Sequence, residues 1–286
     1  MNSSEPEIPD EDIKLFLQAI KLQSVYDFSN YSLKSLKRRI NKIMSDTKLS
    51  IPEIIRKIHE DREFTGKVVK NLTINTTELF RDPKVWRSIF YDILPLYLKM
   101  ESIKVWHAGC STGEEVYSMM IILSKLGILE KSEIYASDIN NDVLDVAREG
   151  KYKYRFNQHF IDNYNSVINT GKDLKEAIPL TSYEYYFNVN KVYDVIKMNP
   201  FLTNKPVYKI IDLVKDENLF NIRFDLIICR NVIIYFNYEL QNKVLDLFYK
   251  NLNKNGCLVL GLHESIMGPY ESRFNKNNLA YFRRDE

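Results

Sequence analysis

The chain has 286 residues, of which 40 are Lys or Arg and 38 are Asp or Glu, so its formal net charge is +2. This length suits one large domain or two small ones, the balanced charge gives no general attraction to nucleic acid or membranes, and no apolar run could span a bilayer. The 3 cysteines lack C-x-x-C spacing and the 4 histidines are scattered, which predicts free thiols in a reducing compartment and no metal site.

Residues 1–70 are predicted to form an all-helical domain. The chain starts with the acidic stretch MNSSEPEIPDED, which is unlike a signal peptide, so we expect a cytoplasmic protein that is not membrane-inserted. A first helix follows from the spacing of Ile13, Phe16, Leu17 and Ile20. A third is expected over Ile51–Glu63, with Pro52 in its first turn.

The second helix has an apolar stripe and a basic stripe on opposite sides. The apolar stripe consists of Leu33, Leu36, Ile40 and Ile43. The basic stripe consists of Lys34, Arg38 and Lys42, flanked by Lys37 and Arg39. Such a face can simply be solvated, which is the usual case for charge runs, or it can dock an acidic partner.

Residues 71–84 form a polar linker, and we expect them to contribute to the site of the α/β domain at 85–286. Trp86–Met100 reads as an amphipathic helix that leads into the first strand.

The stretch Ile103–Ser118, IKVWHAGCSTGEEVYS, predicts a strand, a small-residue turn and a helix N-terminus. This is how open α/β sheets build a ligand crevice. The turn has Gly-x-x-x-Gly spacing rather than the Gly-x-Gly-x-x-Gly of a pyrophosphate site. Glu114 at the helix start disfavours phosphate and suits a cation, which fits the sulfonium and ammonium groups of S-adenosylmethionine (SAM).

Two alternatives remain open for the acidic residues of this region. Thr112 and Glu115 match a capping box, so we assign Glu115 to the helix cap and Glu114 to the ligand. Asp138 ends the predicted strand Glu133–Ser137 and suits ribose hydroxyls, but Asp and Asn also favour helix caps, so it could merely start the next helix.

The remainder of the chain continues the α/β pattern after an interruption. Residues 151–206 are aromatic and predict helices with a small antiparallel insertion. Strands are then expected at Val207–Ile211, Phe224–Cys229 and Cys257–Leu262, a helix at Glu239–Leu252, and an edge strand at Leu279–Arg283.

Four motifs in this order resemble the chemotaxis receptor glutamate methyltransferases (the CheR family). They are NTTELFRD at 75–82, AGCSTGEEVYS at 108–118, SDIN at 137–140 and CRNVIIYF at 229–236. The resemblance implies an α/β fold: a Rossmann-like SAM-dependent methyltransferase sheet with an N-terminal helical domain and a small antiparallel β insertion. It implies methyl transfer from SAM to glutamate side chains of chemoreceptors, giving glutamate 5-O-methyl esters and S-adenosylhomocysteine, by a protein that we expect to be a monomer.

The resemblance also implies the site residues. The cofactor residues would be Asn75, Thr77, Arg81, Glu114, Asp138, Asp212, Leu213, Arg230 and Asn231. Arg81 and Tyr235 would face the transferred methyl as catalytic residues; otherwise Arg81 would form an ion pair with an acid such as Asp82, and Tyr235 would be a core aromatic. With the family in view, docking of an acidic receptor helix becomes the favoured role of the basic stripe. The strands that precede Cys110 and Cys229 would be neighbours, which would place these two thiols close together.

Two other functions compete with this interpretation. Amino methylation of nucleic acid would use the basic helix for phosphate contacts, but the balanced charge and the absence of an Asn/Asp-Pro-Pro-aromatic motif disfavour it. A non-catalytic SAM-sensing or receptor-binding module is disfavoured by the presence of Arg81, Tyr235 and the acidic residues.

Overall fold

The computed structural model describes residues 8–73, 77–169 and 181–284. The chain divides into two compact units: Met1–Ile74 with Ile234–Gln241, and Asn75–Ile233 with Asn242–Glu286. Asn75, a predicted cofactor residue, lies outside the described residues.

The first unit is a helical domain. Its helices are α1 (Asp10–Gln23), α2 (Leu33–Thr47), α3 (Ile51–Glu60) and α4 (Arg62–Leu72). Phe16, Ile20, Ile40 and Ile54 lie fully buried in its core. The predicted helix over Ile51–Glu63 is wrong at its end, because Asp61 caps a separate helix by accepting a 2.9 Å hydrogen bond from Phe64 N.

Helix α2 departs from its predicted stripes at two positions. Leu33 is 52% exposed, although it was expected on the apolar face, because it is the first residue of the helix. Arg39 is only 5% exposed and its guanidinium donates to the carbonyl of Leu72, so it belongs to the interior and not to the basic face. Lys37 is half-buried and pairs with Asp10 Oδ1 at 2.9 Å, whereas Lys34, Arg38 and Lys42 are exposed and form the α2 basic stripe.

The second unit is built on a seven-stranded sheet in the order β6-β2-β1-β7-β8-β10-β9. The strands are β1 (Ile103–Ala108), β2 (Ser132–Asp138), β6 (Val207–Ile210), β7 (Phe224–Cys229), β8 (Leu252–Leu260), β9 (Phe274–Asn277) and β10 (Ala280–Arg283). The first five are parallel to one another, and β10 and β9 extend the sheet in antiparallel fashion. The chain moves from β1 to β2 on one side and returns to β7 on the other, which creates a topological switch point beside β1.

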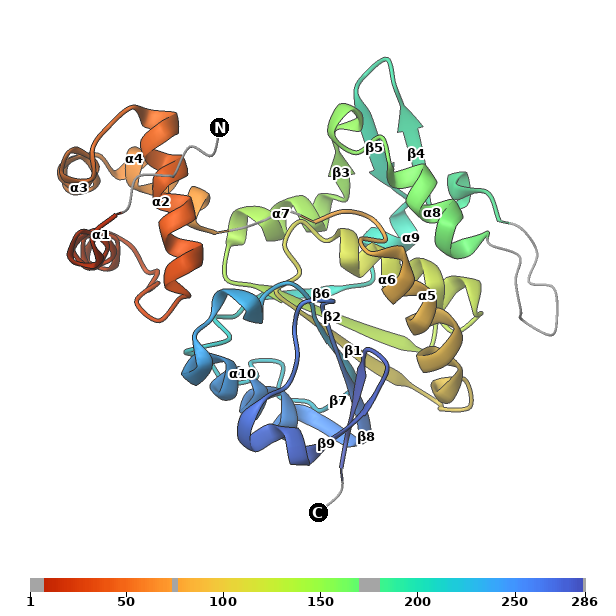
Figure 1. Ribbon diagram of the computed structural model, residues 1–286. Helices are drawn as coiled ribbons and strands as arrows, with labels where there is room; N and C mark the ends of the chain where they lie inside the picture. Colours follow the sequence, from red (N-terminus) through yellow and green to blue (C-terminus); the bar gives the residue numbers. More distant parts are fainter. Residues whose placement is uncertain (1–7, 74–76, 170–180, 285–286) are drawn as a thin grey trace, which may run out of the picture. The chain divides into compact units, whose positions relative to one another are not determined.

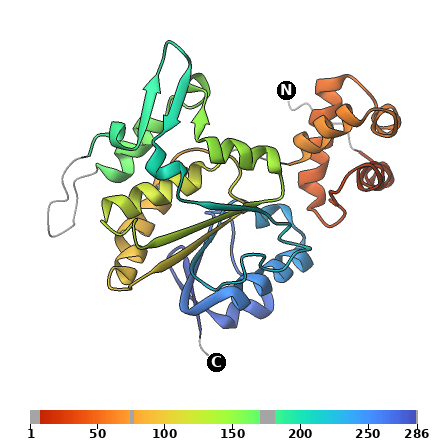
Figure 2. The ribbon, with the colours of Figure 1, turned by 180° about the vertical axis from the view of Figure 1, so that it is seen from behind.

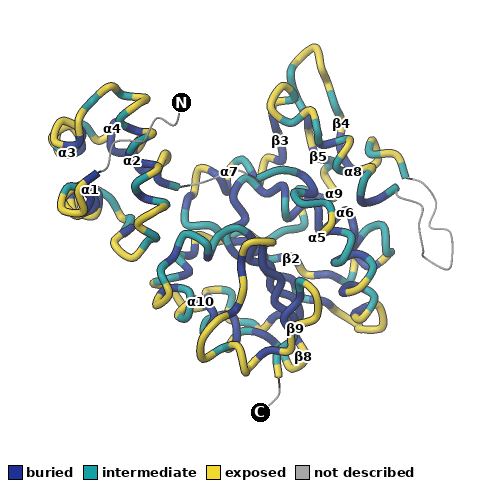
Figure 3. Tube along the Cα trace, in the orientation of Figure 1, coloured by how far each residue is buried: buried dark blue, intermediate teal, exposed yellow. Residues whose placement is uncertain are grey.

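Helices cover both faces of this sheet, as expected for the predicted Rossmann-like fold, which is confirmed. Figures 1 and 2 show α5 (Pro83–Ser88) and α6 (Glu114–Lys125) on one side and the body of α10 (Tyr238–Asn251) on the other. Helix α7 (Asn141–Glu149) follows β2. The strands between these layers are buried, as the dark blue centre of the trace shows (Figure 3).

Two predicted elements differ in the structure. The single helix over Trp86–Met100 is replaced by α5, a π-helical turn at Ile89–Ile93 and a 3-10 turn at Leu94–Tyr97. Pro95 explains the break, because it lacks the N–H that a continuous α-helix requires. The last strand, β10, is not the edge, since β9 pairs with its outer side.

The predicted antiparallel insertion is confirmed as a three-stranded sheet in the order β3-β5-β4. Its strands are β3 (Lys151–Tyr152), β4 (Phe187–Asn190) and β5 (Val195–Met198). Short helices accompany it: η3 (Tyr154–Phe156), α8 (Phe160–Ile168), η4 (Tyr183–Tyr185) and α9 (Pro200–Thr203).

The three cysteines are free and buried. Strands β1 and β7 pair directly, so the predicted adjacency of the strands that precede Cys110 and Cys229 is confirmed. Burial raises the pKa of both thiols well above the ordinary value.

Candidate functional site

Six of the nine predicted cofactor residues lie at or follow the carboxyl ends of β6, β2, β1 and β7, which are four adjacent strands: Glu114, Asp138, Asp212, Leu213, Arg230 and Asn231. Hydrogen bonds between main-chain atoms tie these ends together. Gly109 N and Cys110 N donate to Ser137 O at 2.8 and 2.9 Å, and Ile211 N donates to Asp138 O at 3.1 Å. The structure therefore brings together, at the carboxyl ends of the strands, the loop after β1, Asp138 and the start of the Asp212 segment.

The loop between β1 and α6 needs its two glycines. Gly109 has φ 79° and Gly113 has φ 90°, a region that other residues rarely adopt. A Cβ atom at Gly109 would lie 2.5 Å from the Val232 side chain, and one at Gly113 would lie 2.7 Å from Ala147 Cβ. The loop is thus packed against the next elements and cannot relax away from the sheet.

Glu114 begins α6 as a buried carboxylate, with only 4% of its surface exposed. Burial raises its pKa to about 7, against the effect of a 2.6 Å hydrogen bond from the Thr112 hydroxyl, and the charge of Glu78 adds to the increase. Among the described residues, Glu114 has no ion-pair partner. A cationic ligand would strongly stabilise the charged form of a buried acid of this kind.

The assignment of Glu115 to the helix cap is wrong. Its carboxylate accepts from His107 Nδ1 at 3.0 Å and from Arg230 Nη1 at 3.4 Å, while the N-cap residue of α6 is Gly113 and no side chain caps the helix. The capping box fails because the Thr112 hydroxyl donates to the Glu114 carboxylate instead.

Asp138 organises the turn after β2. Its Oδ2 accepts from Ser111 N at 2.9 Å and its Oδ1 accepts from Asn140 N at 3.0 Å. Burial raises its pKa. The cap of α7 is Asn140, which accepts from Asp142 N at 2.9 Å, so Asp138 is not the helix cap that was the alternative to a ligand role. Its carboxylate retains lone pairs for hydroxyl donors.

Asp212 and Leu213 follow β6, next to Asp138. The Asp212 carboxylate accepts from Val214 N at 2.9 Å and lies 3.6 Å from Lys215 Nζ, so it is partly used within its own turn. The side chain of Leu213 is buried, with 7% exposed.

Arg230 is buried, and its guanidinium clamps the linker segment. Nη2 donates at 2.8 Å to both the carbonyl of Arg81 and the carboxylate of Asp82, and the group lies 5.4 Å from the centre of the Trp86 ring. The Asp82 carboxylate is therefore engaged by Arg230.

The segment that carries Arg81 is held in an unusual conformation. Phe80 and Asp82 have φ values of 54° and 59°, which cost energy for residues with a side chain. Phe80 N donates to Ser118 Oγ at 2.7 Å, and this hydroxyl donates to Glu114 O at 2.7 Å. The main chain beside Arg81 is thereby fixed to the first turn of α6. Thr77 lies at the start of the same segment and is partly buried.

Glu264 supports the site and was not predicted from the sequence. Its carboxylate accepts from Asn231 N at 2.7 Å, from Val232 N at 2.8 Å and from Gly261 N at 2.7 Å. Asn231, with φ 58°, is held in a left-handed conformation there. The only sequence signal for Glu264 is an acid shortly after the strand β8.

Tyr235, the second predicted catalytic residue, belongs to the other compact unit, which includes Ile234–Gln241. Within that unit, its ring lies 4.5 Å from the Arg39 guanidinium carbon and its carbonyl accepts from Ser32 N at 2.8 Å.

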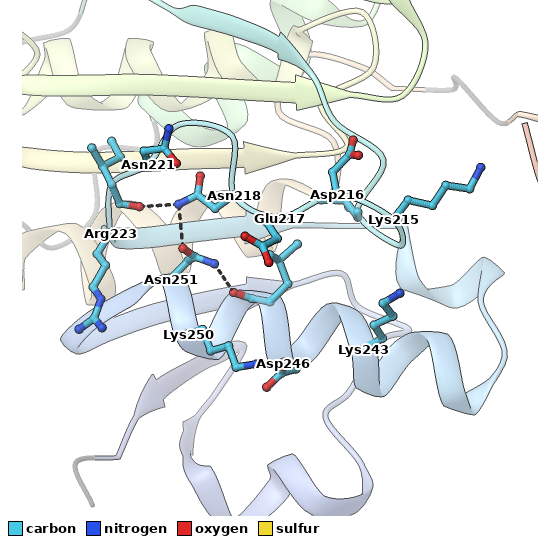
Figure 4. Close-up of a pocket in the computed structure, with 13 residues that line it drawn as sticks. Lys215, Asp216, Glu217, Asn218, Asn221, Arg223, Lys243, Asp246, Lys250 and Asn251 are labelled. Atoms are coloured by element: carbon cyan, nitrogen blue, oxygen red, sulfur yellow. Dashed lines mark hydrogen bonds and ion pairs between the residues drawn. The ribbon is translucent and has the colours of Figure 1, made fainter. Parts of the chain in front are cut away.

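A hollow of about 720 Å³ lies between the loop after β6 and α10, and Figure 4 shows its lining. Its charges are mixed in sign, and the amide of Asn218 is satisfied internally by Ile222 O at 2.5 Å and by Asn251 Oδ1 at 2.8 Å. These internal bonds indicate a structural role for Asn218.

The acidic side chains at the carboxyl ends of the strands fit SAM. Glu114 is a buried acid and Asp138 a half-buried one, and both have raised pKa values, which suits a ligand that brings positive charge and hydroxyl groups. Among the described residues, no group of three or more His, Cys, Asp or Glu is arranged to hold a metal ion.

Comparison with known proteins agrees with this geometry. A family model described as "CheR methyltransferase, SAM binding domain" matches residues 75–282, and one described as "CheR methyltransferase, all-alpha domain" matches residues 11–73. The chain belongs to the CheR methyltransferase family. It is a SAM-dependent methyltransferase, and SAM is its cofactor.

Relatives of this CheR protein cover nearly its whole length. Cher3 of Pseudomonas putida is 37% identical over 267 residues, 93% of each chain. A chemotaxis protein methyltransferase of Listeria monocytogenes is 25% identical over 96% of this chain and 99% of its own. One of Vibrio parahaemolyticus is 30% identical over 91% of each chain. Within residues 8–73, 77–169 and 181–284, no helix has the length and apolar character needed to cross a bilayer.

Proposed function

We propose that this CheR protein methylates glutamate side chains of chemoreceptors at the cytoplasmic side of the membrane and forms 5-O-methyl esters. The names of the Listeria and Vibrio relatives support a role in chemotaxis. The observation that carries the proposal is the fixed main chain at Arg81, which Arg230 and Ser118 tie to the start of α6 beside Glu114.

The cofactor site is proposed to use the residues gathered at the sheet edge. Glu114 would hold the ammonium group and Asp138 the ribose hydroxyls, while Asp212 and Leu213 would border the adenine. Asn75, Thr77 and the main chain at Arg230 and Asn231 would complete the site. When bound, SAM supplies an activated methyl group on a sulfonium.

The reaction needs no general base, because a glutamate side chain has a reference pKa of about 4.3 and is ionised at neutral pH. The remaining task is positioning. A guanidinium can hold one carboxylate oxygen and leave the other free to attack, and Arg81 is proposed for this role. Tyr235 is proposed to orient the carboxylate or exclude water.

Replacing Arg81 tests the mechanism. Arg81→Ala should lower turnover by roughly a hundredfold, which is about 2.7 kcal/mol of barrier, while SAM affinity should change much less. Arg87→Ala is the matched control, because Arg87 Nη1 donates to Ser166 O at 2.8 Å and contributes to structure. Wild-type turnover of Arg81→Ala on saturating receptor would refute the mechanism.

The reaction class can be read from one assay with methyl-labelled SAM and receptor membranes. A methyl ester releases volatile methanol in alkali, whereas a methylated amine does not. Alkali-stable label would contradict ester formation. Tight SAM binding without transfer to any receptor would indicate the non-catalytic alternative.

A further inference from the structure

The β4–β5 hairpin carries exposed apolar side chains at its turn. Val192 is 89% exposed and Tyr193 is 79% exposed, and Phe156 of the adjoining η3 is 70% exposed. Figure 1 shows this hairpin projecting beyond α8 and α9. Together, Phe156, Val192 and Tyr193 are the apolar tip. Single exposed apolar residues are ordinary, but three on one projection mark a contact surface.

Hydrogen bonds define the conformation of the tip. The Asp194 carboxylate accepts from Arg155 N at 2.8 Å and pairs with Arg155 Nε at 3.0 Å, which joins η3 to the hairpin. Tyr193 N donates to Asn190 Oδ1 at 3.0 Å. The turn is thus hydrogen-bonded with its apolar side chains outward, and its one acid is engaged by an arginine.

Basic residues lie at the turn and along the strands that lead to it. Across β3 and β5, Lys151 lies directly opposite Lys197, and both are exposed. Like charges in this position destabilise a sheet, unless an anionic surface lies against them. The basic face consists of Lys151, Lys153, Arg155, Lys191 and Lys197.

The two segments that carry the tip are more basic than the chain as a whole. Residues 151–156 and 188–197 contain five basic residues and one acid, Asp194, which gives +4 (5 − 1), whereas the full chain has a net charge of +2. Glu149 approaches Lys151 at 3.8 Å from outside these segments.

We propose that the apolar tip and the basic face dock this subdomain on an anionic lipid surface. Basic side chains are attracted to anionic headgroups, and aromatic and aliphatic side chains enter the interfacial region. Val192 and Tyr193 lie at the turn and not along the edge strands β3 and β4, which suits entry into a lipid surface better than strand addition by a peptide. This docking is independent of methyl transfer and would concentrate the enzyme at the membrane.

The test is sedimentation of the full-length protein with vesicles of phosphatidylcholine alone or with 30% phosphatidylglycerol, at low and high salt. The protein should bind the anionic vesicles at least about tenfold more tightly than the neutral ones, and salt should abolish the difference. Replacing all three tip residues by Ser, or Lys151, Lys191 and Lys197 by Gln, should weaken binding at least about fivefold.

Control variants change other exposed apolar residues or other exposed lysines in the same unit. They are Leu96→Ser with Met267→Ser, both more than half exposed, and Lys254→Gln with Lys276→Gln. These controls should bind vesicles like the wild type, and all variants should keep the wild-type circular dichroism and SAM affinity.

Equal binding to neutral and anionic vesicles at low salt would overturn the proposal, as would an equal loss in the controls. If no variant changed vesicle binding but the tip variant lost methyl transfer to receptor membranes, the face would belong to a protein partner instead.

Discussion

Glu114→Gln should stabilise the ligand-free protein and weaken its binding of the cofactor. The carboxyl has an ordinary pKa of 4.5 and a folded-state pKa of about 7 because it is buried. Below pH 4.5 the Glu114 carboxyl is protonated in both the folded and the unfolded state, so its burial costs no stability. Between pH 4.5 and 7 the unfolded chain loses a proton that the folded protein retains, so stability falls as pH rises.

Above pH 7 the destabilisation is constant, and a pKa difference of this size corresponds to about 3 kcal/mol. Gln avoids this cost and can still accept the hydrogen bond that Thr112 donates. We therefore expect Glu114→Gln to raise the free energy of unfolding by up to about 3 kcal/mol at pH 8 and by little at pH 5.

Tryptophan fluorescence during urea unfolding is the appropriate assay. The chain has 2 tryptophans, Trp86 and Trp106, and both are buried in the α/β unit, so the signal reports that unit. The control is Glu115→Gln, which removes charge one residue away but loses one of the two acceptor oxygens that meet His107 and Arg230, and should destabilise the unit by about 1–3 kcal/mol.

The same Glu114→Gln variant should bind SAM roughly 10–100-fold more weakly at pH 8, because it loses a charge-assisted hydrogen bond. Unchanged affinity would contradict the ligand role of Glu114. Lower stability at both pH values would contradict the burial argument.

Three further predictions concern other parts of the molecule. Asp138→Ala should weaken SAM binding by about 1–3 kcal/mol, and unchanged affinity in calorimetry would exclude the contact of Asp138 with the ribose. Arg230→Gln should lower turnover more than SAM affinity because it releases the main chain at Arg81; equal losses in single-turnover and binding experiments would contradict this. Reversing the α2 basic stripe should raise KM for receptor at low salt and little at high salt, with SAM affinity unchanged, whereas a defect at all salt concentrations would point to misfolding.

The sequence predicted the main strands and the order of the site segments because their signals are local. An apolar run followed by a polar or small residue marks the carboxyl end of a buried strand, and this pattern placed Asp138 and Arg230 correctly. The antiparallel insertion was also recognisable, because it interrupts the strand–helix alternation.

The partners of individual side chains were not predictable in the same way. Glu114 and Glu115 are neighbours on α6, and only the fold decides which one meets Arg230, a residue 115 positions away. Arg39 belongs to a run of cations, yet its contact with the carbonyl of Leu72 makes it interior. Strand β9 was not predicted, because Phe274 is its one buried residue and the strand therefore has no alternating apolar pattern.

The buried cysteines make the native chain a ready background for site-specific labelling. Maleimides and spin-label reagents react with thiolates, and burial raises the pKa of all three thiols, that of Cys257 to about 12. A cysteine introduced at an exposed position in each compact unit, such as Leu22 in α1 and Met267 before β9, should therefore react alone. Distances between such a pair of probes, with and without SAM and receptor, would follow the catalytic cycle without removing a native residue.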